Sequence, residues 1–277
     1  MKSILSLILM LFVSQTGAIA APAREEVRFN SHGVALSGTL LIPAGDIHAV
    51  VVFVHGSGKQ ERNLHWAERF AAEGIAALVY DKRGAGKSGG EYEGNQSVSG
   101  KNVALLADDA RAGVLHLTTH PRMKGKPIGL AGISLAGWIA PLAARNGQQV
   151  RFLVLWSGPV CKVSEEDIYS KHTGDSNQGT APPYLDALKA RTQEYVWPDF
   201  LGRDTDSAED LAALSIPGLW IFSDNDPSIP VDLSIRQLQA LRAQGHPYQY
   251  ALFSGLGHDN MDRTFAMATD WIRRLRK

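Results

Sequence analysis

The amino-acid sequence predicts an α/β fold, with helices covering both faces of a mostly parallel, eight-stranded sheet. Two observations lead to this prediction. Short apolar runs alternate along the chain with longer amphipathic stretches, which is the pattern of repeated strand and helix units. Polar residues and glycines follow several of the apolar runs directly, as they do where parallel strands end at the edge of a sheet that carries ligands and chemistry.

The apolar runs have the length of strands, and the amphipathic stretches have the length of helices. We expect strands at residues 26–31, 35–42, 49–54, 75–80, 127–132, 151–156, 217–223 and 248–253. We expect helices at residues 64–73, 101–119, 135–146, 231–244 and 260–276, with Asp259 as the cap of the last helix.

The N-terminus has the features of a secretory signal peptide. Lys2 precedes an apolar run at residues 4–13, and residues 18–20 read A-I-A, a small-x-small cleavage site. We therefore expect residues 1–20 to be removed after Ala20 and residues 21–277 to form one domain, exported to the periplasm or the medium. The apolar run is shorter than the roughly 20 residues that span a bilayer, so no stable membrane anchor is expected.

Composition argues against several function classes. The 277 residues carry 28 basic and 28 acidic side chains, so there is no net positive charge to attract nucleic acid. Cys161 is the single cysteine and is expected to be structural. His116 and His120 have helical i, i+4 spacing, but Leu117 stands where a zinc protease would have glutamate. We expect neither a metal nor a cofactor.

A serine in a sharp turn between a strand and a helix is the most informative feature. Residues 128–137 read I-G-L-A-G-I-S-L-A-G, which places Ser134 directly after an apolar strand. In a nucleophile elbow, small residues flank the serine because its turn is tight and lifts the hydroxyl above the sheet. Gly132 fills the first small position, and Ala136 fills the second, with Gly137 next to it.

Partners for this serine follow two later strands. Residues 216–230 form a proline-bounded apolar strand and then a turn that carries Asp224 and Asp226. Residues 248–258 form another strand and a glycine-rich loop that ends in His258. The chain order Ser, Asp, His is the order of a nucleophile, its orienting acid and its general base in one class of acyl-transfer enzymes.

The loop at residues 81–88, D-K-R-G-A-G-K-S, contains a misleading motif. Its end resembles a phosphate-binding loop, but the full motif requires glycine where this chain has Asp81. We therefore expect no nucleotide site. Gly84 and Gly86 are expected to allow a tight turn, and Arg83 to pair locally.

These motifs together resemble the α/β-hydrolase superfamily over nearly everything after about residue 26, including esterase-like, dienelactone-hydrolase-like and S9- or S33-peptidase-like members. The strand at residues 49–54 ends in H-G-S-G, which is similar to the oxyanion loop of such hydrolases. The resemblance implies that Ser134 is the nucleophile, His258 the general base and Asp226 the acid, with Asp224 as the alternative acid. It also implies an oxyanion hole formed by the backbone N–H groups of Ser57 and Leu135.

The resemblance further implies a cap at residues 159–214, after the sixth strand, where the alternation of strands and helices is interrupted. A mobile lid there would exclude water from the site. Within it, residues 184–197 are amphipathic. Aromatic residues of the cap have two candidate roles, either to line a pocket or to pack the cap onto the core. These residues are Tyr184, Tyr195, Trp197 and Phe200.

The function implied first is that of a secreted carboxylesterase acting on a small-molecule acyl substrate through an acyl-enzyme. The alternatives are an aminopeptidase or prolyl-oligopeptidase-like serine peptidase, a thioesterase and an acyltransferase, because one fold supports all of them. Glu165, Glu166 and Asp167 would suit recognition of a free amine, although such acidic groups are commonly just solvated. A non-catalytic binding protein that retains the fold is the remaining alternative.

Overall fold

The structure is a computed structural model, and it describes residues 21–94, 98–176, 179 and 181–275. The predicted signal peptide lies outside the described residues. Within the described part of the chain, no helix combines the length and the apolar character needed to cross a membrane.

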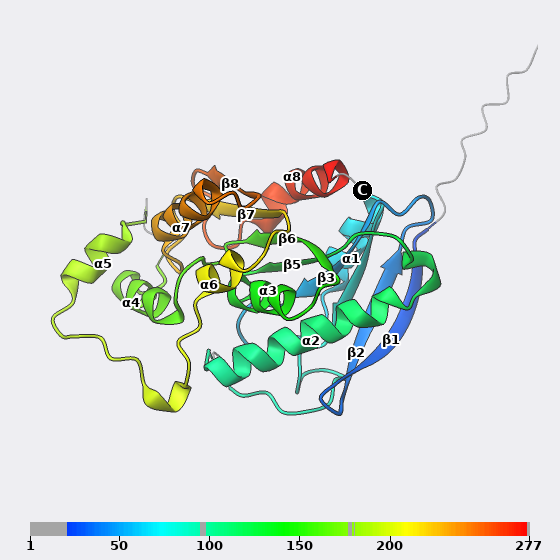
Figure 1. Cartoon of the computed structure of the whole chain (residues 1–277), viewed down its shortest axis with the longest axis horizontal. Coiled ribbons are helices and arrows are strands. Elements are labelled where there is room, and N and C mark those ends of the chain that lie inside the picture. Colours follow the sequence, from blue (N-terminus) through cyan, green and yellow to red (C-terminus); the bar gives the residue numbers. More distant parts are fainter. Residues whose placement is uncertain (1–20, 95–97, 177–178, 180, 276–277) are drawn as a thin grey trace, which may run out of the picture.

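An eight-stranded sheet runs through the molecule, as predicted (Figure 1). Its spatial order is β1-β2-β4-β3-β5-β6-β7-β8. β1 pairs antiparallel with β2, and β2 antiparallel with β4, whereas all the remaining pairs are parallel. The strands are β1 Ala23–Ser31, β2 Val34–Ile42, β3 Ala49–Val54, β4 Ile75–Tyr80, β5 Ile128–Ile133, β6 Val150–Trp156, β7 Gly218–Ser223 and β8 Tyr248–Phe253.

Helices cover both faces of the sheet. One face packs against α2 (Gly100–Thr118), α3 (Ala136–Arg145) and α7 (Val231–Ala243). The other face packs against α1 (Leu64–Ala72) and α8 (Met261–Arg274). Successive side chains of a strand point to opposite faces, so the buried valines of β3 divide between the two cores.

Residues 157–217, which connect β6 to β7, contain most of the structure that the sequence did not predict. They form α4 (Val163–Thr173), α5 (Tyr184–Ala190), the short 3₁₀ helix η2 (Asp199–Leu201) and α6 (Ser207–Ala212). Figure 1 shows α4 and α5 at the end of the molecule opposite β1 and β2. Within the amphipathic stretch at residues 184–197, the helix ends at Ala190, because Arg191, which follows it, has extended backbone angles.

Two smaller expectations were wrong. Asp259 does not cap α8, because the helix begins one residue later, after Asn260, and Asn260 instead turns its amide toward the hydroxyl of Ser157. Arg83 does not pair within its own turn. It forms a buried ion pair with Asp109 in the middle of α2, and Nε of Arg83 lies 3.0 Å from Oδ2 of Asp109.

The Arg83–Asp109 pair joins the turn after β4 to α2. The Asp109 side chain is fully buried, and that of Arg83 is 6% exposed. Burial raises the pKa of Asp109, and the hydrogen bonds from Arg83 and Ser31 oppose that rise. Each of these two charges is costly to bury, and each compensates the other, so removing one leaves the other buried and unpaired.

Arg83→Met is expected to lower the free energy of unfolding by about 3–5 kcal/mol at pH 7, because it leaves the Asp109 carboxylate buried without its counter-charge. Urea unfolding followed by circular dichroism measures this loss. The double variant Arg83→Met/Asp109→Leu should recover most of it, since an apolar pair can replace a buried ion pair. A loss of under about 1 kcal/mol in the single variant would contradict this account.

Candidate active site

Ser134 occupies the turn between β5 and α3 in a strained backbone conformation. Its φ is +57°, in the left-handed region that non-glycine residues rarely adopt, and its N–H donates to the carbonyl of Trp156 at 3.0 Å. A Cβ on Gly132 would lie 2.5 Å from the carbonyl oxygen of Val54. Only glycine therefore fits two residues before the serine, as the elbow motif requires.

Gly137 is the second position in this turn that has no room for a side chain. It lies one residue after Ala136, which fills the second small position of the motif. A Cβ on Gly137 would lie 2.5 Å from Cδ of Pro159. Ala136 is accommodated and fully buried. The start of α3 can therefore approach the chain that leaves β6 because residue 137 has no side chain.

His258 and Asp226 meet beyond the ends of β8 and β7. Nδ1 of His258 lies 2.9 Å from both carboxylate oxygens of Asp226. The Asp226 side chain is fully buried, and its Oδ1 also accepts the backbone N–H groups of Ser228 and Ile229. A proton on Nδ1 directed at this carboxylate leaves Nε2 of His258 free to act as a base.

Asp224, the alternative acid, is directed elsewhere. Its carboxylate accepts the hydroxyl of Ser254 at 2.7 Å and the N–H of Gly255 at 2.9 Å. Asp224 therefore organises the loop that leads to His258, and Asp226 contacts the imidazole itself.

The surroundings of His258 have opposing effects on its pKa. Burial lowers this pKa, but the hydrogen bond and the negative charge of Asp226, with smaller effects from Asp175 and Asp259, raise it above its ordinary value. The imidazole side chain is 25% exposed, so one side of the ring faces the cavity described next.

Ser134, His258 and Ser57 line one cavity of about 560 Å³. Among the described residues, the N–H groups of Ser57 and Leu135 donate to no backbone carbonyl. The cavity has an apolar wall formed by Val98, Trp138, Val196, Trp197, Pro198, Leu201 and Ile229. It also has a polar wall formed by Glu166, Asp167, Ser170, Lys171, Asp175 and Ser228.

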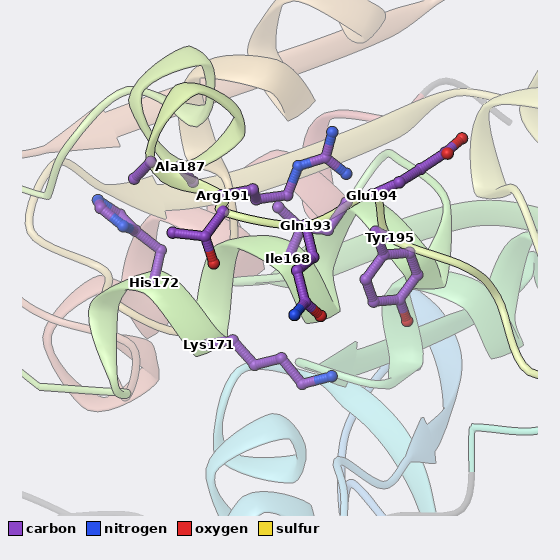
Figure 2. Close-up of a pocket in the computed structure, with 10 residues that line it drawn as sticks. Ile168, Lys171, His172, Ala187, Arg191, Gln193, Glu194 and Tyr195 are labelled. Atoms are coloured by element: carbon purple, nitrogen blue, oxygen red, sulfur yellow. The ribbon is translucent and has the colours of Figure 1, made fainter.

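A bridged trio of side chains closes the cavity on the side of α4. Asp167 accepts hydrogen bonds from Nζ of Lys171 at 2.7 Å and from the hydroxyl of Tyr195 at 2.5 Å. Beyond the trio lies a second cavity of about 460 Å³ between α4, α5 and residues 191–195 (Figure 2). Lys171 and Tyr195 line both cavities and so lie at the boundary between them.

The four aromatic residues of this region have different roles. Tyr195 and Trp197 line the cavity that Ser134 and His258 share, and both also pack against the core, so both expected roles apply to them. Tyr184 is buried in the core and packs α5 onto it. Phe200 is 87% exposed and lines neither cavity, so it has neither of the roles expected of it.

Two charged residues near this site have surroundings that the sequence did not indicate: Glu166, expected to be solvated or to recognise an amine, and Lys82, to which no role was assigned. Glu166 faces the cavity, and burial together with the charges of Asp167, Asp175 and Asp226 raises its pKa to about 8. Lys82 lies behind the loop that carries Ser57 and hydrogen-bonds to it. The signal for Lys82 was present, since a lysine directly follows the first polar residue after a buried strand, but its contacts are with residues more than 20 positions away.

In the motif that resembles a phosphate-binding loop, the polar groups form hydrogen bonds within the loop itself. The N–H of Lys87 and the hydroxyl of Ser88 both donate to Asp81, at 2.8 Å and 2.6 Å.

Cys161 is fully buried, and burial raises the pKa of its thiol well above the ordinary value. Its thiol is therefore poorly suited to be a nucleophile.

Comparison with known proteins agrees with the fold. Residues 45–202 match the serine aminopeptidase S33 family. An esterase from Pyrococcus furiosus superposes with a TM-score of 0.65 at 19% identity, over 92% of this chain and 89% of that one. An acylaminoacyl peptidase from Pyrococcus horikoshii superposes with a TM-score of 0.69 at 17% identity, over 92% of this chain and 42% of that one.

One curated relative is also similar. A polyketide transferase from Penicillium crustosum is 35% identical over 100 residues, which are 36% of this chain and 30% of that protein. The shared stretch is thus under a third of the relative's length. The S33 match, in contrast, covers more than half of the chain. The protein is therefore a hydrolase with the α/β-hydrolase fold and belongs to the serine aminopeptidase S33 family.

Proposed function

We propose that this protein is a serine hydrolase that cleaves carboxylic esters through an acyl-enzyme intermediate. The observation that carries the proposal is the contact of His258 Nδ1 with both oxygens of buried Asp226, at 2.9 Å, in a cavity that His258 shares with Ser134. An imidazole held in this way can take a proton from a serine hydroxyl and return it to a leaving group.

In the first half of the reaction, Oγ of Ser134 attacks the ester carbonyl carbon while Nε2 of His258 takes the hydroxyl proton. The carbonyl π electrons move onto oxygen and form a tetrahedral oxyanion. When the oxyanion collapses, the bond to the alkoxy oxygen breaks, and His258 returns its proton to the departing alcohol. Asp226 stabilises the imidazolium between these two steps without itself being protonated.

In the second half, water replaces the alcohol. His258 takes a proton from the water as its oxygen attacks the acyl carbon, and the second tetrahedral oxyanion then expels Ser134, which regains a proton from His258. The products are a carboxylic acid and free enzyme. The N–H groups of Ser57 and Leu135 would stabilise the oxyanion in both halves.

The shape and lining of the cavity support a small or medium-sized ester. A volume of about 560 Å³ is in the range of small-molecule sites, and the apolar wall that includes Trp138 and Trp197 suits an acyl chain. The likeness to the Pyrococcus furiosus esterase is consistent with this class of substrate.

A second candidate function is the hydrolysis of aminoacyl bonds, as in the peptidases to which the chain is similar. The acidic wall of Glu166, Asp167 and Asp175 favours it, because a cationic amine would offset these charges. Lys171 already neutralises Asp167, and the raised pKa of Glu166 keeps this group largely protonated at pH 7. The charge left to hold an amine is thus smaller than the number of carboxyl groups indicates, and we place esters first.

Hydrolysis of p-nitrophenyl esters, from acetate to long chains, by mature wild type is expected to be measurable, and Ser134→Ala is expected to lower kcat by at least about 10⁴-fold. Aminoacyl p-nitroanilides are assayed in parallel, because amide turnover above ester turnover would support the second candidate function. Equal ester hydrolysis by wild type and Ser134→Ala would contradict the proposal. Covalent labelling by a fluorophosphonate, absent in Ser134→Ala, identifies the nucleophile independently.

The pH dependence of ester hydrolysis follows from the pKa of His258. A general base must be neutral, so kcat/KM is expected to fall as pH falls through a midpoint above about 6.5, the ordinary histidine value. Asp226→Asn removes the charge that raises this pKa while burial still lowers it. The midpoint should therefore move to lower pH, and kcat should drop by about 10³–10⁴-fold.

Asp224→Asn is the matched control for Asp226→Asn, since it makes the same chemical change two residues away. We expect its midpoint to be unchanged and its kcat to stay within about threefold of wild type, because Asp224 does not contact the imidazole. If Asp224→Asn moved the midpoint and Asp226→Asn did not, the assignment of the acid would be reversed.

Tyr195→Ala is expected to favour longer acyl chains, because it removes the ring that lies at the boundary between the catalytic cavity and the second cavity (Figure 2). The ratio of kcat/KM for p-nitrophenyl decanoate to that for the butyrate should rise by about threefold or more. Phe200→Ala removes an aromatic ring from the same segment without touching either cavity, and its ratio should match wild type. An unchanged ratio in Tyr195→Ala would show that the two cavities do not join.

A further inference from the structure

Lys82 is a buried cation outside the catalytic residues. It is the second residue after β4, and 2% of it is exposed. No carboxylate among the described residues forms an ion pair with its ammonium group. A buried charge is costly unless hydrogen bonds compensate it, so the partners of Lys82 are informative.

Those partners belong to the loop that carries Ser57. Nζ of Lys82 donates to the carbonyl oxygen of Gly56 at 2.8 Å and to that of Gly58 at 2.9 Å. The intervening carbonyl, that of Ser57, accepts the side-chain amide of Gln60 at 2.5 Å. The backbone N–H of Lys82 in turn donates to the carbonyl of Gln60 at 3.0 Å. Three successive carbonyls of the loop are therefore fixed.

Fixing the carbonyl of Gly56 also fixes the direction of the N–H of Ser57. The two groups belong to one planar trans peptide unit, in which C=O and N–H point in opposite directions. Lys82 holds the carbonyl from one side, and Ser57 lines the catalytic cavity, whereas Lys82 is not among the residues that line it. The bond to Lys82 thus turns the N–H of Ser57 away from the lysine.

We propose that Lys82 is a positioning residue for the oxyanion hole, which aims the N–H of Ser57 at the substrate oxyanion and strengthens it as a donor. This inference rests on the proposed hydrolase function. A cation bound to the carbonyl polarises the whole peptide unit, and hydrogen bonds in such a chain reinforce one another. Burial lowers the pKa of Lys82 to about 8, so the group remains mostly charged at pH 7.

The effect should be specific to the transition state. The oxyanion forms only after Ser134 attacks, so a misaligned Ser57 N–H would lower kcat and leave substrate binding nearly intact. A lysine that merely tied two loops together would affect the melting temperature without this selectivity. Comparing the change in kcat with the change in KM therefore distinguishes a positioning role of Lys82 from a merely structural one.

The test is Lys82→Met, which keeps a long side chain and removes all the donors. With the best p-nitrophenyl ester at pH 7, kcat is expected to fall by about 10–100-fold, less than the 10²–10³-fold that follows removal of an oxyanion donor itself, and KM should change by under about threefold. Affinity for an alkyl trifluoromethyl ketone, whose adduct with serine carries an oxyanion, should fall by the same factor as kcat/KM. Affinity for the matching methyl ketone should be unchanged.

Gln60→Ala and Ser88→Ala complete the experiment. Gln60→Ala removes the tether on the Ser57–Gly58 peptide unit, which adjoins the unit that contains the Ser57 N–H. It should give the same pattern with a smaller fall in kcat, which keeps the proposal testable if Lys82→Met does not fold. Ser88→Ala removes hydrogen bonds from the turn after Lys82 that do not reach the Ser57 loop, and its kcat should match wild type.

The outcomes also separate this inference from the function on which it rests. Ester turnover by wild type that Ser134→Ala abolishes supports the hydrolase, and a kcat within threefold of wild type in both Lys82→Met and Gln60→Ala then overturns only the role of Lys82. A fall in ketone affinity that is equal for the trifluoromethyl and methyl compounds would overturn it as well. No turnover by wild type would overturn both.

Discussion

Six neighbouring strands, from β4 to β8 in the sheet order, run parallel, so their carboxyl ends lie along one edge of the sheet. Ser57, Ser134 and His258 follow three of these strands and line one cavity, although about 200 residues separate the first from the last. The strained turn at Ser134 depends on the same arrangement, because it needs the carbonyl of Trp156 at the end of β6 as the acceptor for its N–H.

Buried hydroxyl groups fix the loop that carries His258. The hydroxyl of Ser157 donates to the carbonyl of His258 at 2.7 Å and accepts the amide of Asn260 at 3.0 Å. The hydroxyl of Ser223 accepts the N–H of Gly257 at 3.1 Å. Ser223 therefore gives the loop an additional anchor. Loops held by satisfied polar groups keep a catalytic side chain in a fixed position.

The strands and the long helices could be predicted because their signals are local, and all eight strands begin within three residues of the positions expected from periodicity. α4 was missed because its sequence is mostly polar and its helix depends on burying Ile168 and Tyr169 against the core. Sequence position also could not decide between Asp224 and Asp226, two residues apart on one turn, because only the path of the loop to His258 determines which carboxylate meets the imidazole.

The charges around the cavity suggest why a buried cation, Lys82, lies next to the loop that carries Ser57. Asp167 and Asp175 line the cavity, and Asp226 contacts His258 at its edge, where, in the proposed reaction, a further negative charge develops. Like charges in a partly dry site repel one another strongly, so the oxyanion needs positive charge close by. Lys171 forms an ion pair with Asp167, whereas Lys82 has no carboxylate partner among the described residues and contacts the loop that carries Ser57 directly. Its charge therefore lies next to the loop from which, in the proposed reaction, the N–H of Ser57 donates to the oxyanion.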